Sequence, residues 1–247
     1  MIDFYDNLPD VMVFMHGERY QWHNDDPVYG KWSTALLIVK RWIANIGADG
    51  VAMLQNLQLP YVVSEGYANL RCVWIMGCPS ELKLDAANST ASTQVVYFDV
   101  FKELFPGEAI PPVVGVACCG QFAVSREKVR ERSLDDYRRY RQWIFDTSED
   151  DHVSGRVFEY TWHMIFGKPP VHCPNAKECY CRTFGLCKLE CERDEQCGER
   201  WRYPAWQELP KDWPAIGLDG KSQDQESIAT LRNAAMSSTS LLGGWFT

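Results

Sequence analysis

The sequence predicts an α/β layer fold, in which a mixed sheet is flanked by helices and a cysteine-rich loop segment is added. Residues 11–15 and 113–119 are short, uniformly apolar runs, which are typical of buried strands. Longer segments between such runs carry apolar residues at helical spacing. The alternation of these two patterns favours helices packed on a sheet in one large domain. A chain of 247 residues is long enough to bury the core that such a fold needs.

The elements follow in order along the chain. After the strand at 11–15, residues 31–47 are amphipathic with a helical period and end at a glycine, which predicts a helix. A strand is predicted over 69–75, a helix over 95–105, and a strand over 113–119. This succession supports the α/β class.

Serine residues mark the starts of three further helices. Ser125 precedes "REKVRER" and Ser133 precedes "LDDYRRYRQWIFDT", and a serine hydroxyl at this position accepts a hydrogen bond from an early helical N–H. Ser154 and Gly155 open the third, "RVFEYTWHMIFG". We therefore divide the chain into an α/β catalytic domain (1–170), a cysteine-rich cap packed on it (171–217) and a flexible C-terminal tail (218–247), which is rich in Ser, Asp, Gln and Gly.

Composition sets limits on the partners. The net charge of −8 argues against a protein that coats nucleic acid, although a local basic patch remains compatible with it. No apolar run reaches the roughly 18 residues of a membrane helix. The segment after Met1 does not have the pattern of a secretory signal. With Met1 as the native start, these observations predict a cytoplasmic protein that does not contact a membrane.

The first candidate site follows the strand at 11–15. His16 lies at the end of the strand, and His23, Asp25 and Asp26 come shortly after it. Ligands of open α/β sheets bind beyond the carboxyl ends of strands. Imidazole with adjacent carboxylates suits a divalent cation or acid–base chemistry. The alternatives are a solvated turn, which Asn-Asp-Asp-Pro favours, and a core histidine at position 16.

A second candidate site lies on the predicted late helix. Glu159 and His163 are four residues apart and share a helix face, with Arg156 three residues before Glu159. A carboxylate that orients a histidine is a common arrangement around a general base. The alternative is an ordinary pair on a helix surface. Asp150 and Asp151 add acidic density upstream, although a charge run of this kind is usually a solvated loop.

Six cysteines are concentrated within 25 residues. Their thiolates suit structural zinc, they can pair as disulfides, or they can remain free thiols. Cys118 and Cys119, at the end of a predicted buried strand, are interpreted as small core residues. The six residues of this metal or disulfide set are Cys173, Cys179, Cys181, Cys187, Cys191 and Cys197.

Several stretches resemble a fungal family known only as a domain of unknown function. They are "YDNLPDVMVFMHGERYQWHND", "GYANLRC", "CCGQFAVSREKVRERSLDDYRRYRQW", "SGRVFEYTWHMIFG" and "CYCRTFGLC", and the resemblance runs from about Asp3 to Cys187. In that family a further strand and helix precede "YDNLPD", which implies that this chain begins inside the domain.

The layout of the family is similar to that of GT-A-like glycosyltransferases, which belong with Rossmann-like folds. That similarity implies a divalent metal on a nucleotide-sugar diphosphate, held here by His23, Asp25 and Asp26. His163 would be a further ligand or base. The spacing of the acids departs from the usual Asp-x-Asp.

The chain also resembles fungal synthases that make arginine-containing cyclodipeptides from aminoacyl-tRNAs. This resemblance implies two acyl transfers, with arginyl-tRNA and a second charged tRNA as partners and no required cofactor. The catalytic set would be His23, Asp25, Asp26, Glu159 and His163, with one histidine as the base and paired acids holding the guanidinium. Substrate-binding residues would be His16, Asp150, Asp151 and Arg156.

The tRNA would bind a basic stretch interleaved with tyrosines, for which the alternative is an exposed helix pair of mixed charge. Those synthases have an Asp-Asp-x-x-Glu motif, and none of the three Asp-Asp pairs here has a glutamate in register. The expected function is a transferase of specialised metabolism, with cyclodipeptide synthesis ahead of glycosyl transfer. A binding protein without chemistry is the third class, to which the aromatic content is equally suited. The candidate tRNA contacts are Arg126, Lys128, Arg130, Arg138, Arg139 and Arg141.

Overall fold

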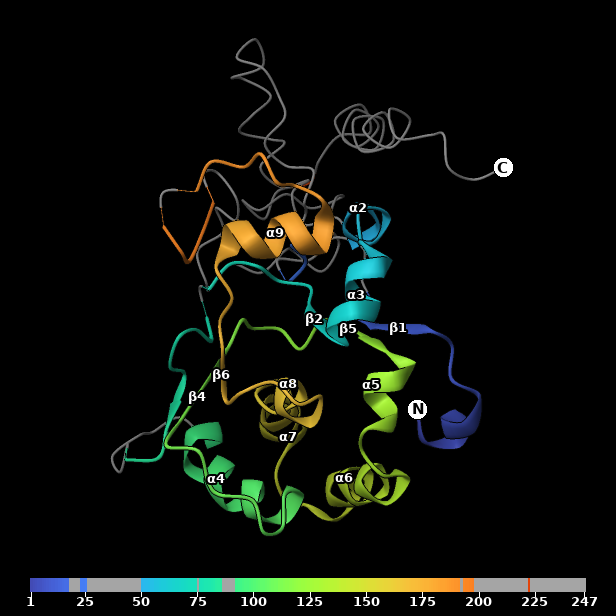
Figure 1. The fold of residues 1–247 in the computed structure, drawn as a ribbon. Helices are drawn as coiled ribbons and strands as arrows, with labels where there is room; N and C mark the ends of the chain where they lie inside the picture. The colour runs from blue at the N-terminus through green and yellow to red at the C-terminus, as the bar shows by residue number, and fades with distance from the viewer. Residues whose placement is uncertain are drawn as a thin grey trace.

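The structure, a computed structural model, describes residues 1–17, 23–25, 50–74, 76–85, 92–191, 193–197 and 222. These residues form an α/β arrangement of two small sheets with flanking helices, which confirms the predicted class (Figure 1). The predicted helix at 31–47 and the candidate residue Asp26 lie outside the described residues.

The first sheet is antiparallel and separates two cores. Its order is β1 (Val11–Phe14), β5 (Phe122–Ser125), β2 (Tyr67–Asn69). Because side chains alternate along a strand, Phe122 and Val124 face one core and Ala123 faces the other. Among the described strands β1 pairs only with β5, so it lies at an edge of this sheet.

The larger core lies on the Phe122 side of this sheet. It is built with α4 (Ser92–Leu104), α6 (Leu134–Asp146), α7 (Asp151–Glu159) and α8 (Trp162–Ile165). The smaller core packs α2 (Gly50–Gln55), α3 (Leu59–Glu65) and α9 (Ala176–Phe184) on the opposite side. Figure 1 shows the two groups of helices at opposite ends of the molecule with β1, β2 and β5 between them.

The second sheet is mixed. Its order is β3 (Leu82–Lys83), β4 (Val113–Val116), β6 (Val171–His172), with β4 antiparallel to β3 and parallel to β6. The predicted strand at 113–119 is therefore confirmed over its first four residues. The residues that follow β4 form the loop that leads into β5.

Two predicted helix starts are confirmed. The Ser125 hydroxyl accepts from the backbone N–H of Lys128 at the start of α5 (Arg126–Arg130). Ser133 accepts from the N–H of Asp136, whose carboxylate in turn accepts from the backbone N–H of Ser133, which forms a capping box for α6. A 3₁₀ helix, η1 (Ile2–Asn7), precedes β1.

The predicted strand at 69–75 is wrong over residues 70–74. Leu70 still donates to the Gln121 carbonyl beside the end of β5, but the N–H groups that follow leave the ladder: Arg71 donates to the Asn69 side chain and Cys72 donates to Asp25. The N–H of Trp74 donates to the carbonyl of Glu195. The N–H groups of Cys72 and Trp74 are thus satisfied by distant segments and that of Arg71 by a nearby side chain, so the chain leaves the sheet.

The predicted helix over 156–166 is instead two helices. The first, α7, begins earlier, because the Asp150 carboxylate accepts from the N–H of Val153 at 2.9 Å and caps it. It ends at Glu159, and α8 begins at Trp162. At the break, the Thr161 hydroxyl donates to the Val157 carbonyl, and the Tyr97 hydroxyl donates to the Tyr160 carbonyl at 2.9 Å.

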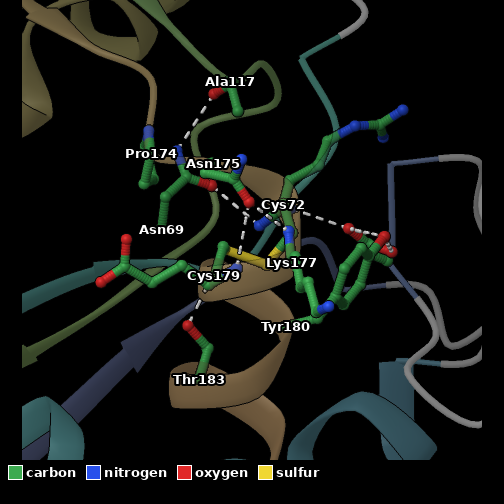
Figure 2. The surroundings of a disulfide bond; sticks show 12 residues. Asn69, Cys72, Ala117, Pro174, Asn175, Lys177, Cys179, Tyr180 and Thr183 are labelled. Atoms are coloured by element: carbon green, nitrogen blue, oxygen red, sulfur yellow. Dashed lines mark hydrogen bonds between the residues drawn. A yellow bond between two sulfur atoms is a disulfide. The ribbon is translucent and has the colours of Figure 1, made fainter. Parts of the chain in front are cut away.

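The cysteine-rich segment is joined to the body of the chain. Cys179 on α9 is bonded to Cys72, and Cys173 is bonded to Cys78. Figure 2 shows the Cys72–Cys179 disulfide beside Tyr180 and Thr183 of α9. Within the described residues we find no helix that is long and apolar enough to cross a membrane.

Candidate functional site

A cavity of about 760 Å³ lies where the ends of β1 and α7 meet the β4–β5 loop. Its volume is within the range of about 300–1,000 Å³ that is usual for small-molecule sites. The lining combines apolar residues with several ionisable side chains from separate parts of the sequence. The lining residues with imidazole, carboxylate or guanidinium groups are His16, His23, Glu81, His152, Arg156 and Glu159.

Gln121 holds the two predicted histidines in place. Its side-chain oxygen accepts from the backbone N–H of His16 at 3.0 Å, and its amide nitrogen donates to the carbonyl of His23 at 2.7 Å. The two imidazole rings stack with their centroids 4.1 Å apart. Gln121 is buried at the start of β5, so one amide joins the segment after β1 to the sheet.

The His23 imidazole is neutral at physiological pH. Burial lowers its pKa to about 3, and the positive charge of neighbouring His16 and Arg71 acts in the same direction. A neutral imidazole can accept a hydrogen bond from a substrate hydroxyl or amine. With so low a pKa it is a weak proton acceptor.

Glu159 is the strongest candidate for proton transfer. It is the last residue of α7, and its carboxylate accepts a short hydrogen bond from the backbone N–H of Cys119. Burial raises the pKa of Glu159, and the Cys119 N–H and the Arg156 charge oppose that rise without cancelling it. A carboxyl group with a raised pKa exchanges protons nearer neutrality than an ordinary one.

The floor of the cavity contains a disulfide between adjacent residues, Cys118 and Cys119. We interpreted these cysteines as small core residues. They are buried, but they are bonded to each other and line the cavity. The turn has positive φ at Cys119 (87°) and Gly120 (59°), and the N–H of Cys118 donates to the Met76 carbonyl. The sequence feature that could have indicated this bond was the pair of adjacent cysteines at the end of a predicted strand.

Asp25 is structural in this arrangement. It is buried, and its two oxygens accept from the Tyr180 hydroxyl at 2.7 and 2.9 Å. One of these oxygens also accepts from the N–H of Cys72 at 2.8 Å. Asp25 does not line the cavity, so the structure does not bring it together with Glu159.

His163 is also outside the cavity lining. Its ring is fully buried, and its Nε2 lies 3.0 Å from the carbonyl oxygen of Pro170, so this nitrogen carries the proton. Burial lowers the pKa of His163 to about 4. Because the helix breaks between them, Glu159 and His163 do not share a face, and the pair that we predicted does not form. Arg156 and Glu159, on one helix, do meet at the cavity.

The acidic residues upstream of α7 cap the helix. Asp150 is its N-cap, Asp151 its first residue, and both are exposed and outside the lining. His152 and Glu81 also line the cavity, and neither was predicted as a site residue from the sequence.

The basic stretch is largely neutralised locally, because five of its six candidate tRNA contacts are paired with carboxylates. Arg126 pairs with Asp10 and Arg141 with Asp3. Arg130 donates to the Asp6 carbonyl. Within the stretch itself the pairs are Lys128–Glu131, Arg138–Asp135 and Arg139–Asp136. Most of these pairs are exposed and weak, but they leave a surface of mixed charge.

All ten cysteines are in disulfides. Of the three alternatives for the six clustered cysteines, which were zinc ligands, disulfides and free thiols, the structure has the disulfides. Among the described residues, one group has the donor atoms and spacing for a metal ion, and it consists of Cys118, Cys119 and Glu159. The remaining bonds are Cys181–Cys187 and Cys191–Cys197.

The model of a family described as "protein of unknown function (DUF3431)" matches residues 1–40 and 37–182. The chain belongs to this family. Comparisons of this DUF3431 chain with curated proteins and with solved structures give no match. The description of DUF3431 assigns no activity, so a functional conclusion depends on the chemistry of the cavity.

Proposed function

We propose that the chain is a transferase that acts on a small polar substrate in this cavity, with glycosyl transfer as the first candidate. The observation that carries the proposal is the convergence of His16, His23, Arg156 and Glu159, from segments far apart in the sequence, on one cavity of about 760 Å³. Convergent polar groups and a perturbed carboxyl pKa are features of active sites.

In a glycosyl transfer, an acceptor hydroxyl attacks the anomeric carbon of a nucleotide sugar, and the bond from that carbon to the diphosphate oxygen breaks. Glu159 takes the hydroxyl proton, and its raised pKa suits it to do so near neutral pH. Arg156 supplies a positive charge for the diphosphate. His23, being neutral, accepts a hydrogen bond from a sugar hydroxyl.

The divalent metal implied by the GT-A resemblance does not fit the described donor set. The resemblance assigned Asp25 as a ligand of this metal. In the structure both Asp25 oxygens accept hydrogen bonds from Tyr180, and one also accepts from Cys72. Asp26 lies outside the described residues. We therefore derive no step through such a metal.

We rank glycosyl transfer ahead of cyclodipeptide synthesis, the reverse of the order expected from the sequence, and the five disulfides support this ranking. Disulfides persist in oxidising compartments and are rare in the cytosol. We accordingly propose an oxidising compartment in place of the expected cytoplasm. Charged tRNAs belong to the cytosol, whereas a nucleotide sugar can be imported into a secretory lumen.

Cyclodipeptide synthesis is the second candidate, because two carboxylates line the cavity. Glu81 and Glu159 are suited to a guanidinium, which carboxylates bind through paired hydrogen bonds. The neutralised basic stretch offers less support for a tRNA surface than its sequence suggested.

One experiment separates the candidates. The purified, oxidised full chain is incubated with a panel of nucleotide sugars and acceptors, and in parallel with arginyl-tRNA and a second charged tRNA, with products identified by mass. Sugar transfer supports the first candidate, and an arginine diketopiperazine that RNase abolishes supports the second. Glu159→Gln is expected to reduce either activity at least about a hundredfold, the lower end for a general base. Asp99→Asn, an exposed acid on α4, is the matched control. Ligand binding without turnover in a folded chain would refute both candidates.

A further inference from the structure

The Cys118–Cys119 bond differs from the other disulfides in what it can do for the fold. A disulfide stabilises a protein mainly by restricting the unfolded chain, and this effect grows with the length of the loop that it closes. The Cys72–Cys179 bond spans 107 residues, whereas Cys118 and Cys119 are adjacent. A bond between neighbours removes almost no freedom from the unfolded chain. Its role must therefore be local, at the cavity floor.

A carboxylate and a guanidinium lie close to the sulfur atoms of this pair. A carboxylate oxygen of Glu159 and the two sulfur atoms lie within 4.8 Å of one another. Arg71, buried behind the turn, donates from Nη1 to the Cys119 sulfur at 3.6 Å, and a guanidinium there favours the thiolate over the thiol. Both cysteines line the cavity, so a small reagent can reach them.

We propose that the Cys118–Cys119 disulfide is a reducible pair, and that its dithiol form joins Glu159 in a site for a thiophilic divalent cation such as Zn²⁺. Two thiolates and a carboxylate are an accepted zinc donor set, and three protein ligands leave a fourth position open toward the cavity. The inference is independent of the proposed transferase activity, because it concerns the redox state and metal affinity of this turn alone.

The chemistry balances with a dithiol as the reductant. One reductant thiolate attacks a cysteine sulfur, the Cys118–Cys119 bond breaks, and the other cysteine leaves as a thiolate. The second reductant thiolate then attacks the mixed disulfide, so that the reductant becomes a cyclic disulfide and the protein has gained two electrons and two protons. Binding of the cation displaces the two thiol protons to solvent.

The turn is held in a way that allows the sulfurs to separate. Zn–S bonds of about 2.3 Å at a tetrahedral angle require the sulfurs to lie about 3.8 Å apart. The backbone is held on both sides of the pair, by the Asn69 amide that donates to the Ala117 carbonyl and by the N–H of Leu70 that donates to the Gln121 carbonyl. With the backbone held, the proposal requires the sulfurs to separate by rotation of the cysteine side chains, without unfolding of the loop.

The first test is selective reduction. The oxidised full chain is treated with dithiothreitol under native conditions, free thiols are alkylated, and the sites are mapped by mass. We expect alkylation at Cys118 and Cys119, with Cys72 and Cys179 protected in the smaller core. If the exposed Cys181–Cys187 bond opens while the Cys118–Cys119 bond stays closed, the pair is not reducible and the proposal fails.

The second test is zinc binding, measured by competition with a chromogenic chelator under anaerobic conditions. Reduced wild type is expected to bind one equivalent more than oxidised wild type, a comparison that needs no substitution. Cys118→Ser with Cys119→Ser should lose that equivalent, and Glu159→Gln should weaken it at least about tenfold. Cys181→Ala with Cys187→Ala, which removes the accessible short-loop disulfide, should retain it. An equivalent that survives the first double variant, or disappears in the second, overturns the assignment.

Discussion

Removing the Cys72–Cys179 disulfide is expected to destabilise the chain by less than its sequence separation suggests. This bond spans 107 residues and encloses the Cys78–Cys173 bond, which spans 95. While the inner bond remains, the outer bond closes only a ring of about 14 residues, because the two cysteines on each side are 6 apart (78 − 72 and 179 − 173). The loop-entropy relation gives about 3 kcal/mol for such a ring.

The second removal is expected to have the larger effect. With either bond already absent, the remaining bond closes a loop of roughly 100 residues, which the same relation values at about 5 kcal/mol. Cys72→Ala/Cys179→Ala and Cys78→Ala/Cys173→Ala should each therefore lose about 3 kcal/mol, and the quadruple variant about 8 kcal/mol. The excess over additivity is about 2 kcal/mol.

The assay is urea unfolding without reductant, with free energies from linear extrapolation. Cys181→Ala/Cys187→Ala is the control, because its 6-residue separation is outside the nested pair and its loss of about 2 kcal/mol should add to that of either variant. Strictly additive losses for the two nested bonds would refute the reasoning, since they would show that the bonds do not act through the unfolded chain.

Three further predictions concern single side chains. Because burial raises the pKa of Glu159, the acidic limb of the pH–activity profile should lie above the usual carboxyl range. Glu159→Gln should abolish that limb. An acidic limb near pH 4 in the wild type would contradict this prediction. Between about pH 6.5 and pH 4 the His163 imidazole is protonated in the unfolded chain but stays neutral in the folded chain, so the free energy of unfolding should fall as the pH is lowered through this window. His163→Gln should reduce the pH dependence of that free energy by about 1.4 kcal/mol per pH unit within the window. Urea unfolding at a series of pH values measures it. Tyr180→Phe should lower the free energy of unfolding, measured by thermal unfolding, by about 1.5–3 kcal/mol, because the buried carboxylate of Asp25 loses its hydroxyl partner. A loss under about 0.5 kcal/mol would count against a stabilising role for this hydrogen bond.

The sequence predicted features that depend on neighbouring residues. Ser125 and Ser133 cap their helices through atoms three residues away, so the pattern was sufficient. The break between α7 and α8 was not predictable in this way, because the carbonyl of Tyr160 is held by Tyr97, which is 63 residues distant. The amphipathic pattern of 156–166 continues through the break and gives no warning of it.

The candidate site was only partly predicted, because some of its contacts join residues that are far apart in the sequence. The resemblance to the synthases implied one catalytic set that contains His23 and Glu159, and His16, His23 and Arg156 line the cavity with Glu159. The role of Asp25 depends on Tyr180, 155 residues later, and no local pattern reports such a partner. Whether these residues carry out a transfer stays a prediction.

The two faces of the antiparallel sheet carry side chains of unequal size. On the α9 side the central positions are Ala68 and Ala123, while the opposite face carries bulky residues such as Phe122. On this face α3 contacts all three strands of the sheet, and α9 packs on α3 and brings Tyr180 to Asp25, two residues from His23. A larger side chain at Ala123, which is buried in this core, would push α3 and the α9 helix packed on it outward. Through Tyr180 and Asp25 that displacement would reach the His23 imidazole of the cavity wall. The shape of the cavity can thus be tuned from the far side of the sheet, by residues that no substrate touches.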